Sequence, residues 1–216
     1  MDSIRIITFI KACGVAAMLV GCGGTEQKTL PILGQREPVT RMVDGKKVID
    51  TIYHRIPDFR LLNQDSVEIT NELFADGVYV ANFFFTHCPS ICPTMQRNLL
   101  KVYEHYRGDD RVRFLSHSID FRNDSPPVLK AYAEKLGVND DRWQFVCGTK
   151  AQIYGLSDAY MVYTKEDTNV PGGYDHSGYF LLVDRDRHIR GVYDGTNEQQ
   201  VGFLIDDLKI LLKEYE

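Results

Sequence analysis

Two cysteines stand four residues apart in the stretch Phe83-Phe-Phe-Thr-His-Cys88-Pro-Ser-Ile-Cys92-Pro93. The apolar run Val78 to Phe85 is rich in valine and phenylalanine, which is typical of a central strand covered on both faces. Proline suits the start of a helix, because its missing N–H would have no partner there. Pro93 therefore predicts a helix to about Arg107, with Cys92 at its N-cap and both thiols at a strand-to-helix turn.

The expected helix also affects the chemistry of the second thiol. A helix N-terminus carries roughly half a positive charge. That field favours thiolate over thiol, so we expect Cys92 to ionise more readily than a free cysteine. A thiol pair at this position can form a disulfide, bind a soft metal, or do both.

Strands and helices alternate along the rest of the chain. We expect a short strand pair over 61–70, strands at 112–119, 143–147, 179–184 and 188–193, and helices at 125–136, 150–160 and 199–215. Upstream, the dipeptide Asp44-Gly45 is a hairpin signal, and we expect that hairpin to pack on the main domain. This order predicts an α/β fold of thioredoxin type, a central sheet flanked by helices with an N-terminal hairpin extension.

The first residues have the features of an export signal. Arg5 and Lys11 are basic, and the apolar stretch Ala12 to Val20 falls short of the about 20 residues that span a bilayer. Its length is that of a signal-peptide core. The segment Leu19-Val20-Gly21-Cys22 resembles a bacterial lipobox, which implies cleavage before Cys22 and lipidation of its thiol. An ordinary signal peptide with an incidental cysteine is the alternative.

The composition suits one globular domain with a short appendage. The chain has 216 residues, of which 44% are hydrophobic, and its formal net charge is −5. It therefore lacks the concentrated basic surface that nucleic-acid binding needs. We divide it into a lipoprotein signal peptide over 1–21, a tether and hairpin over 22–53, and a thioredoxin-like domain over 54–216. Export places the thiols in an oxidising compartment.

Two thiolates rarely complete a metal site, so a third ligand is expected. His176 lies in Gly172-Gly-Tyr-Asp-His-Ser-Gly178, directly before an expected strand. In a thioredoxin-like fold, the loop before that strand abuts the cysteine turn. Two sulfurs and one imidazole form a soft site suited to copper, as Cu(I) or Cu(II). A solvated surface histidine is the alternative interpretation.

Four other residues offer donors near the thiols or elsewhere in the chain. We expect His87 to lie at the surface or beside the ligands, and Met95 to pack in the core. We interpret His117 as a core histidine. Cys147 is expected to be a small buried apolar residue rather than a resolving thiol.

Three segments resemble the Sco/SenC family, and they occur in the family's order. They are Phe85-Thr-His-Cys88-Pro-Ser-Ile-Cys92-Pro93, Asp120-Phe-Arg-Asn-Asp124-Ser-Pro126 and Asp175-His176-Ser177. The resemblance implies a thioredoxin-like, exported copper protein that delivers copper to the dinuclear copper centre of cytochrome c oxidase. It implies Cys88, Cys92 and His176 as copper ligands and the two cysteines as a redox-active pair. Asp120 and Asp175 would lie beside these ligands.

We therefore predict a metallochaperone that transfers copper by ligand exchange, rather than an enzyme. Its expected location is that of a bacterial lipoprotein, anchored in the membrane through Cys22 and facing the periplasm. Its expected partners are the copper-centre subunit of cytochrome c oxidase and a copper donor protein or thiol reductant, with no nucleic acid. The alternative is a thiol-disulfide oxidoreductase, with Cys88 attacking and Cys92 resolving. The sequence departs from the family pattern at Phe121, Asn123 and Gly178.

Overall fold

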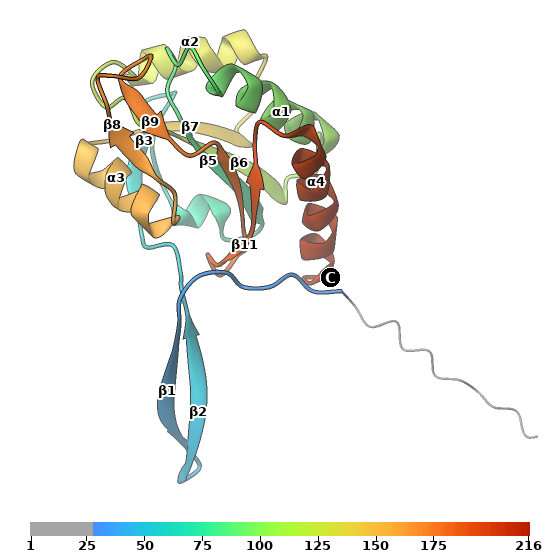
Figure 1. Cartoon of the computed structure of the whole chain (residues 1–216). Coiled ribbons are helices and arrows are strands. Elements are labelled where there is room, and N and C mark those ends of the chain that lie inside the picture. Colours follow the sequence, from blue (N-terminus) through green and yellow to red (C-terminus); the bar gives the residue numbers. More distant parts are fainter. Residues whose placement is uncertain (1–27) are drawn as a thin grey trace, which may run out of the picture.

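The computed structural model describes residues 28–216 (Figure 1). Its strands are β1 Arg36–Val43, β2 Lys46–Tyr53, β3 Arg60–Asn63, β4 Glu68–Thr70, β5 Val78–Phe84, β6 Val112–Ser118, β7 Trp143–Cys147, β8 Thr164–Glu166, β9 Tyr174–His176, β10 Tyr179–Val183 and β11 Ile189–Asp194. Its helices are α1 Cys92–His105, α2 Pro126–Leu136, α3 Lys150–Ala159 and α4 Glu198–Lys213, with a short 3-10 helix at Asn71–Phe74. The expected signal peptide and Cys22 lie outside the described residues.

A seven-stranded sheet forms the centre of the molecule, in the order β11-β10-β5-β6-β7-β3-β4. β5, β6 and β7 are parallel, whereas β10 and β3 run antiparallel to their neighbours β5 and β7. All seven residues of β5 are buried, as expected for a central strand covered on both faces. The predicted α/β fold of thioredoxin type with an N-terminal hairpin is therefore confirmed.

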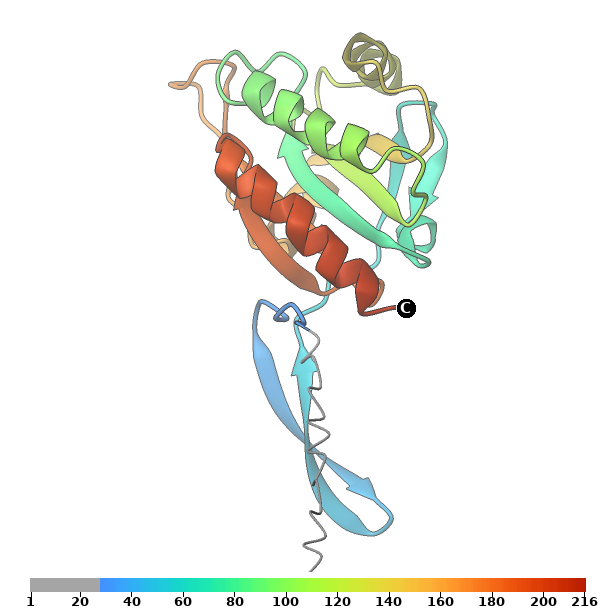
Figure 2. The same ribbon diagram turned by 90° about the vertical axis from the view of Figure 1, so that its right-hand side faces the viewer.

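Helices cover both faces of this sheet (Figures 1 and 2). α1 and α4 lie side by side on one face, and α2 packs on the same face through the contact of Tyr132 with Phe84. α3 covers the opposite face, where Tyr160 at its end contacts Phe83. The side chains of β5 alternate between these layers, so the thiol segment that follows it begins from a strand fixed on both sides.

The N-terminal hairpin β1–β2 forms where the Asp44-Gly45 signal predicts it. Both turn residues have positive φ, 50° for Asp44 and 77° for Gly45, as a two-residue hairpin turn requires. Its predicted packing on the main domain is wrong, because the hairpin projects away from the body (Figures 1 and 2). On both of its faces apolar side chains alternate with polar or charged ones, so neither face offers a continuous apolar patch for the domain to cover.

A second short hairpin, β8–β9, was not expected from the sequence. Its strands have three residues each, and a turn with positive φ at Gly172 and Gly173 joins them. β9 ends at His176, so this hairpin carries the predicted third ligand. In Figure 1 it lies at the left side of the body, and two residues separate it from the start of β10 at Tyr179.

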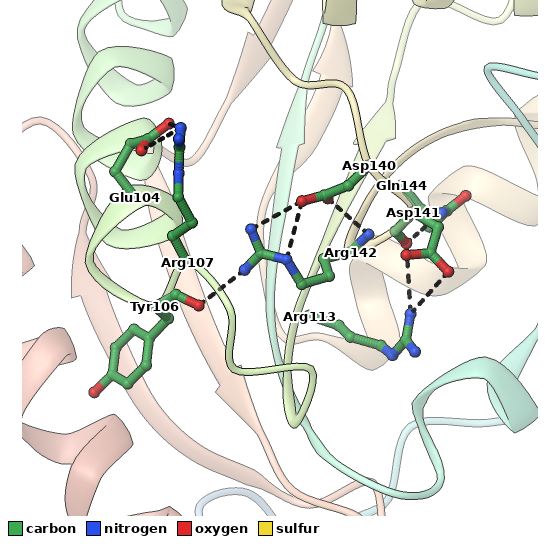
Figure 3. Close-up of polar contacts among 8 residues, drawn as sticks. All are labelled: Glu104, Tyr106, Arg107, Arg113, Asp140, Asp141, Arg142 and Gln144. Atoms are coloured by element: carbon green, nitrogen blue, oxygen red, sulfur yellow. Dashed lines mark hydrogen bonds and ion pairs between the residues drawn. The ribbon is translucent and has the colours of Figure 1, made fainter.

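A cluster of charged residues closes the end of the sheet opposite the thiols (Figure 3). Arg142, which precedes β7, is 3% exposed. Its guanidinium donates to Asp140 Oδ2 at 2.9 Å and to the carbonyl of Tyr106 at 3.0 Å, and it lies 4.5 Å from the ring centroid of Tyr103. Tyr106 is the C-cap of α1, so this cluster fixes the end of α1 that is remote from Cys92.

Within residues 28–216, no helix is both long enough and apolar enough to cross a membrane.

Candidate metal centre

The two predicted thiols lie at the junction of β5 and α1. Cys92 is the first residue of α1 and is 1% exposed, while Cys88 lies in the preceding turn and is 8% exposed. The predicted position of Cys92 at the N-cap is wrong by one residue, because Ile91 occupies the N-cap and Pro93 the second helical position. Both sulfurs are free thiols that face each other across this turn.

His176 meets these thiols from the β8–β9 hairpin. Its Nε2 lies 3.3 Å from Cys92 Sγ, and its Nδ1 lies 3.2 Å from the carbonyl oxygen of Ser177. A proton on Nδ1 can be donated to that carbonyl, which leaves the Nε2 lone pair directed at the sulfurs. The ligand atoms of Cys88, Cys92 and His176 all lie within 4.8 Å of one another. The structure thus brings together the three residues that the sequence singled out as ligands.

Close packing holds the β8–β9 hairpin against the thiol turn. At Gly172, where φ is +89°, an added Cβ would lie 2.8 Å from the ring of Phe85 and 3.0 Å from Pro89. At Gly178, an added Cβ would lie 3.3 Å from Ile91. Glycine is therefore required at Gly172 for both backbone angle and approach. Gly178, a departure from the family pattern, also lets the chain lie close to the first turn of α1.

The loop between β6 and α2 supports both ligand-bearing segments. Asp120 Oδ1 accepts a hydrogen bond from the hydroxyl of Tyr174 at 3.1 Å, two residues before His176. Asp124 accepts hydrogen bonds from the backbone N–H of Thr86 at 3.0 Å and from its hydroxyl at 2.5 Å, two residues before Cys88. Both carboxylates are buried, so one loop fixes the histidine hairpin and the thiol turn relative to each other.

The structure separates the two acids that were expected beside the ligands. Asp120 acts through Tyr174 and makes no hydrogen bond to His176. Asp175 is exposed on the opposite face of β9 from Tyr174 and His176, because neighbouring residues of a strand point to opposite faces. The structure therefore does not bring Asp175 to the thiols. Sequence reasoning gave no role to Asp124 or Thr86, and their only signal was their position within two of the matched segments.

The two thiols differ in their affinity for a proton. A hydrogen bond from the Cys92 thiol lowers the pKa of Cys88 to about 3, and His176 assists. The same shared proton, together with burial, raises the pKa of Cys92. The prediction that Cys92 ionises more readily is therefore wrong, because its proton is retained to stabilise the neighbouring thiolate and its sulfur is the less exposed of the two.

The remaining donor residues do not join this cluster. His87 is exposed and contacts Thr86, whereas Met95 and His117 are completely buried. Burial lowers the pKa of His117 to about 4, as expected for a neutral core histidine. Cys147 is half-buried at the end of β7, and burial raises the pKa of its thiol.

A second group of potential ligands lies at the other end of the sheet. Asp184, Asp186 and His188 place a ligand atom each within 4.8 Å of one another. The buried carboxylate of Asp184 already accepts from Arg190 at 3.0 Å and from the backbone N–H of His188 at 2.8 Å. This group is a structural ion-pair cluster, so the thiol–imidazole group is the candidate metal centre.

Comparison with known proteins gives one consistent result. A sequence model described as SCO1/SenC matches residues 51–213. A SCO1/SenC family lipoprotein from Bacillus anthracis is 27% identical, with a TM-score of 0.68 over 73% of this chain and 95% of that one. Bradyrhizobium japonicum ScoI with copper bound is 26% identical, with a TM-score of 0.60 over 72% and 98%.

A third solved structure concerns redox behaviour. BsSco, in which a disulfide switch was identified, is described as a member of the Sco family of cytochrome c oxidase assembly proteins. It is 26% identical to this chain, and its TM-score is 0.63 over 72% of this chain and 92% of its own. The residues matched by the SCO1/SenC sequence model, 51–213, include the thiol turn, the acidic loop and the histidine hairpin.

Proposed function

Because the chain belongs to the SCO1/SenC family, we propose that it binds copper and delivers it for the assembly of the dinuclear copper centre of cytochrome c oxidase. The observation that carries this proposal is the meeting of Cys88, Cys92 and His176 at one point. Two thiolates and an imidazole are soft donors that suit Cu(I), and Cu(II) with one further donor. The copper-bound ScoI supports the choice of metal.

Copper is the cargo, so release matters as much as binding. Cys88 is the most readily ionised and the more exposed of the two sulfurs, and it is therefore the ligand that a partner's thiolate or imidazole replaces first. His176 belongs to a hairpin that packs against the thiol turn at Gly172 and is held through Tyr174, so it is replaced after Cys88. Cys92, at the start of α1, holds the metal longest. Transfer of this kind exchanges ligands one at a time and requires no bond-forming catalysis.

The oxidation state of the thiol pair controls this binding. Formation of a bond between the sulfurs of Cys88 and Cys92 gives up two protons and two electrons, which reduce one disulfide of a partner protein to two thiols. The new disulfide leaves only His176 as a donor, so oxidation releases copper. The disulfide switch identified in BsSco supports this coupling.

Metal titration under anaerobic conditions tests the proposal. Reduced protein is expected to bind one copper ion. His176→Ala should weaken binding by more than about 100-fold, the upper range for residues that only orient a ligand. His87→Ala removes a neighbouring but exposed imidazole and should bind as the wild type does. Equal copper affinity in the two variants would overturn the assignment of His176.

The asymmetry of the thiols favours a second function, thiol-disulfide exchange with a partner. A thiolate at Cys88 can attack a disulfide, and Cys92 can then resolve the mixed disulfide. This activity needs both cysteines but not His176. Rapid reduction of a disulfide protein that survives in His176→Ala would support the reductase over the chaperone.

We also propose that the chain is exported and held at the membrane. Export and anchoring are inferred from the signal-peptide features over 1–21 and the lipobox at Cys22. The similarity to a SCO1/SenC family lipoprotein supports this inference. The mature chain would then consist of a tether and hairpin over 22–53 and the copper-binding domain over 54–216. Mass spectrometry of the membrane-extracted protein should find acylated Cys22 as the first residue.

A further inference from the structure

The hairpin β1–β2 exposes apolar side chains that no described residue covers. We define its tip as residues 42–49. Ile49 is 77% exposed, Met42 64%, Val43 51% and Val48 44%. Isolated two-stranded hairpins are at best marginally stable in water. A projecting hairpin with this much exposed apolar surface therefore indicates a contact outside the domain.

The register of the hairpin combines apolar and basic groups on both faces of the tip. Met42 pairs with Lys47 and Val43 with Lys46, and the members of each pair share a face. Arg41 forms an ion pair with Asp50, whereas Lys46 and Lys47 have no ion-pair partner within residues 28–216. Asp44 lies at the turn, so the tip carries two ammonium groups and one carboxylate, a net charge of +1. Apolar stems beside ammonium groups suit the boundary between acyl chains and lipid phosphates.

The root of the hairpin lies at the end of the sheet opposite the metal centre. The backbone N–H of Leu33 donates to the carbonyl of Ile189, at the start of β11. The metal centre lies instead beyond the end of β5 and before the start of β10. Figure 1 shows that the hairpin leaves the body on the side where the described chain begins (blue), away from the start of α1.

The tether joins the body at this same end. The backbone N–H of Leu30 donates to Glu214 at 2.7 Å, and its carbonyl accepts from Arg190 at 2.6 Å. Eight residues lead from Cys22 to Leu30, so a lipid on Cys22 could lie no more than about 26–29 Å from this point. The eight-residue strands of the hairpin have a similar length, about 27 Å at 3.4 Å per residue.

We propose that the hairpin tip contacts an anionic membrane surface and acts as a spacer, which keeps the metal centre on the side of the body that faces away from the bilayer. This inference rests on the proposed lipid anchor at Cys22. The greatest reach of the tether matches the length of the hairpin, and both leave the same end of the body, so together they give two points of attachment to one surface. The copper ligands then face outward, where a partner in the same membrane can reach them from its exposed domain.

Tryptophan fluorescence of the full lipidated chain in vesicles tests the contact. The chain has one native tryptophan, Trp143, which is fully buried and supplies a constant background. In Ile49→Trp, we expect emission to shift to shorter wavelength and to be quenched by brominated phosphatidylglycerol. In Tyr179→Trp, the new side chain lies at the metal end, so it should remain unquenched.

Charge reversal tests the electrostatic part of the proposal. Each lysine near an anionic surface contributes about fivefold to binding, so adding Lys46→Glu and Lys47→Glu to Ile49→Trp should abolish the quenching. Lys135→Glu, at an exposed lysine of α2, should leave the quenching of Ile49→Trp unchanged. The tip variants should titrate with copper as the wild type does, so this proposal and the copper proposal fail independently.

Two outcomes would overturn the membrane contact. One is an unquenched, solvent-like emission from Ile49→Trp in phosphatidylglycerol vesicles. The other is a shift to shorter wavelength that brominated lipid does not quench and that increases with protein concentration, because a second copy of the chain then covers the tip. Absence of acylation at Cys22 would remove the anchor and with it the proposed orientation.

Discussion

The charge of the metal centre before copper binds is set by a single shared proton. Cys92 donates to Cys88 and holds the pKa of the latter at about 3. Because this pKa is lowered, the thiolate form predominates at every pH above it and is lost only as the pH falls through about 3. An ordinary cysteine, with a pKa near 8.5, becomes a thiolate only in alkaline solution.

We therefore predict that Cys88 of the reduced, metal-free protein is alkylated by iodoacetamide even at pH 5. Cys92→Ala removes the donated proton, so reaction at pH 5 should fall steeply and recover only at alkaline pH. The rate is measured by mass spectrometry of the peptide that contains each thiol. Cys147, whose pKa is raised by burial, is the internal control. Alkylation of the wild-type pair only in alkaline solution would contradict this description.

At the residue scale, the sequence predicted which side chains gather but not how they share charge. The cysteine spacing and the histidine segment were visible as motifs. Which sulfur is the thiolate depends on the burial of Cys92 and on the distance between two sulfurs, and neither is encoded locally. The support of Thr86 by Asp124 was hidden for the same reason, because these residues meet only after β5 and β6 pair.

At the scale of elements, the position of His176 depends on a hairpin whose turn fits tightly on the thiol segment. Gly172 and Gly173 both have positive φ, but only Gly172 has neighbours, the rings of Phe85 and Pro89, where a Cβ would lie. Either glycine-to-alanine change should cost about 1–2 kcal/mol of stability through backbone strain. Gly173→Ala therefore introduces backbone strain alone, whereas Gly172→Ala introduces the same strain and also displaces the hairpin.

We predict that Gly172→Ala weakens copper binding by about tenfold, which corresponds to about 1.4 kcal/mol, because the hairpin must move off Phe85. Gly173→Ala should lose similar stability and retain wild-type copper affinity. Anaerobic copper titration and thermal unfolding of both variants provide the measurements. Equal copper affinities would show that the hairpin tolerates the displacement and that its turn does not position His176.

Elements with strong periodicity were predictable, and those set by contact were not. The predicted ends of β5, α2 and β7 agree with the structure to within one residue, because apolar runs and proline signals mark them. β8 and β9 have three residues each, which is too short for a period to show. The Asp44-Gly45 turn predicted the hairpin, but its direction relative to the domain could not be predicted. Each face mixes apolar and polar side chains, so the sequence pattern does not indicate which face the domain would cover.

At the scale of the whole molecule, the metal centre and the Arg142 cluster lie at opposite ends of the sheet. α1 connects the two ends. Its 14 residues span about 21 Å at 1.5 Å per residue, from Cys92 to the Arg142 cluster shown in Figure 3. Damage at Arg142 should therefore reduce the stability of the whole fold without altering the ligand set, provided that the protein remains folded.

We predict that Arg142→Met lowers the free energy of unfolding by about 2 kcal/mol, since the carbonyl of Tyr106 and the carboxylate of Asp140 lose their shared donor. Asp140 is partly exposed, so water replaces part of that loss. In a chain of this size the melting temperature should fall by about 4–8 °C, as measured by circular dichroism.

The matched control is Arg113→Met, whose guanidinium lies 4.0 Å from Asp141 in the same cluster. Asp141 is 81% exposed, so solvent screens this pair and it contributes little. The melting temperature of Arg113→Met should therefore change by about 2 °C or less. Both variants should bind one copper ion below their transitions, because the thiols and His176 lie at the other end of α1. If folded Arg142→Met lost copper affinity while Arg113→Met did not, the two ends of the sheet would be coupled through α1, and the separation argued from the topology would fail.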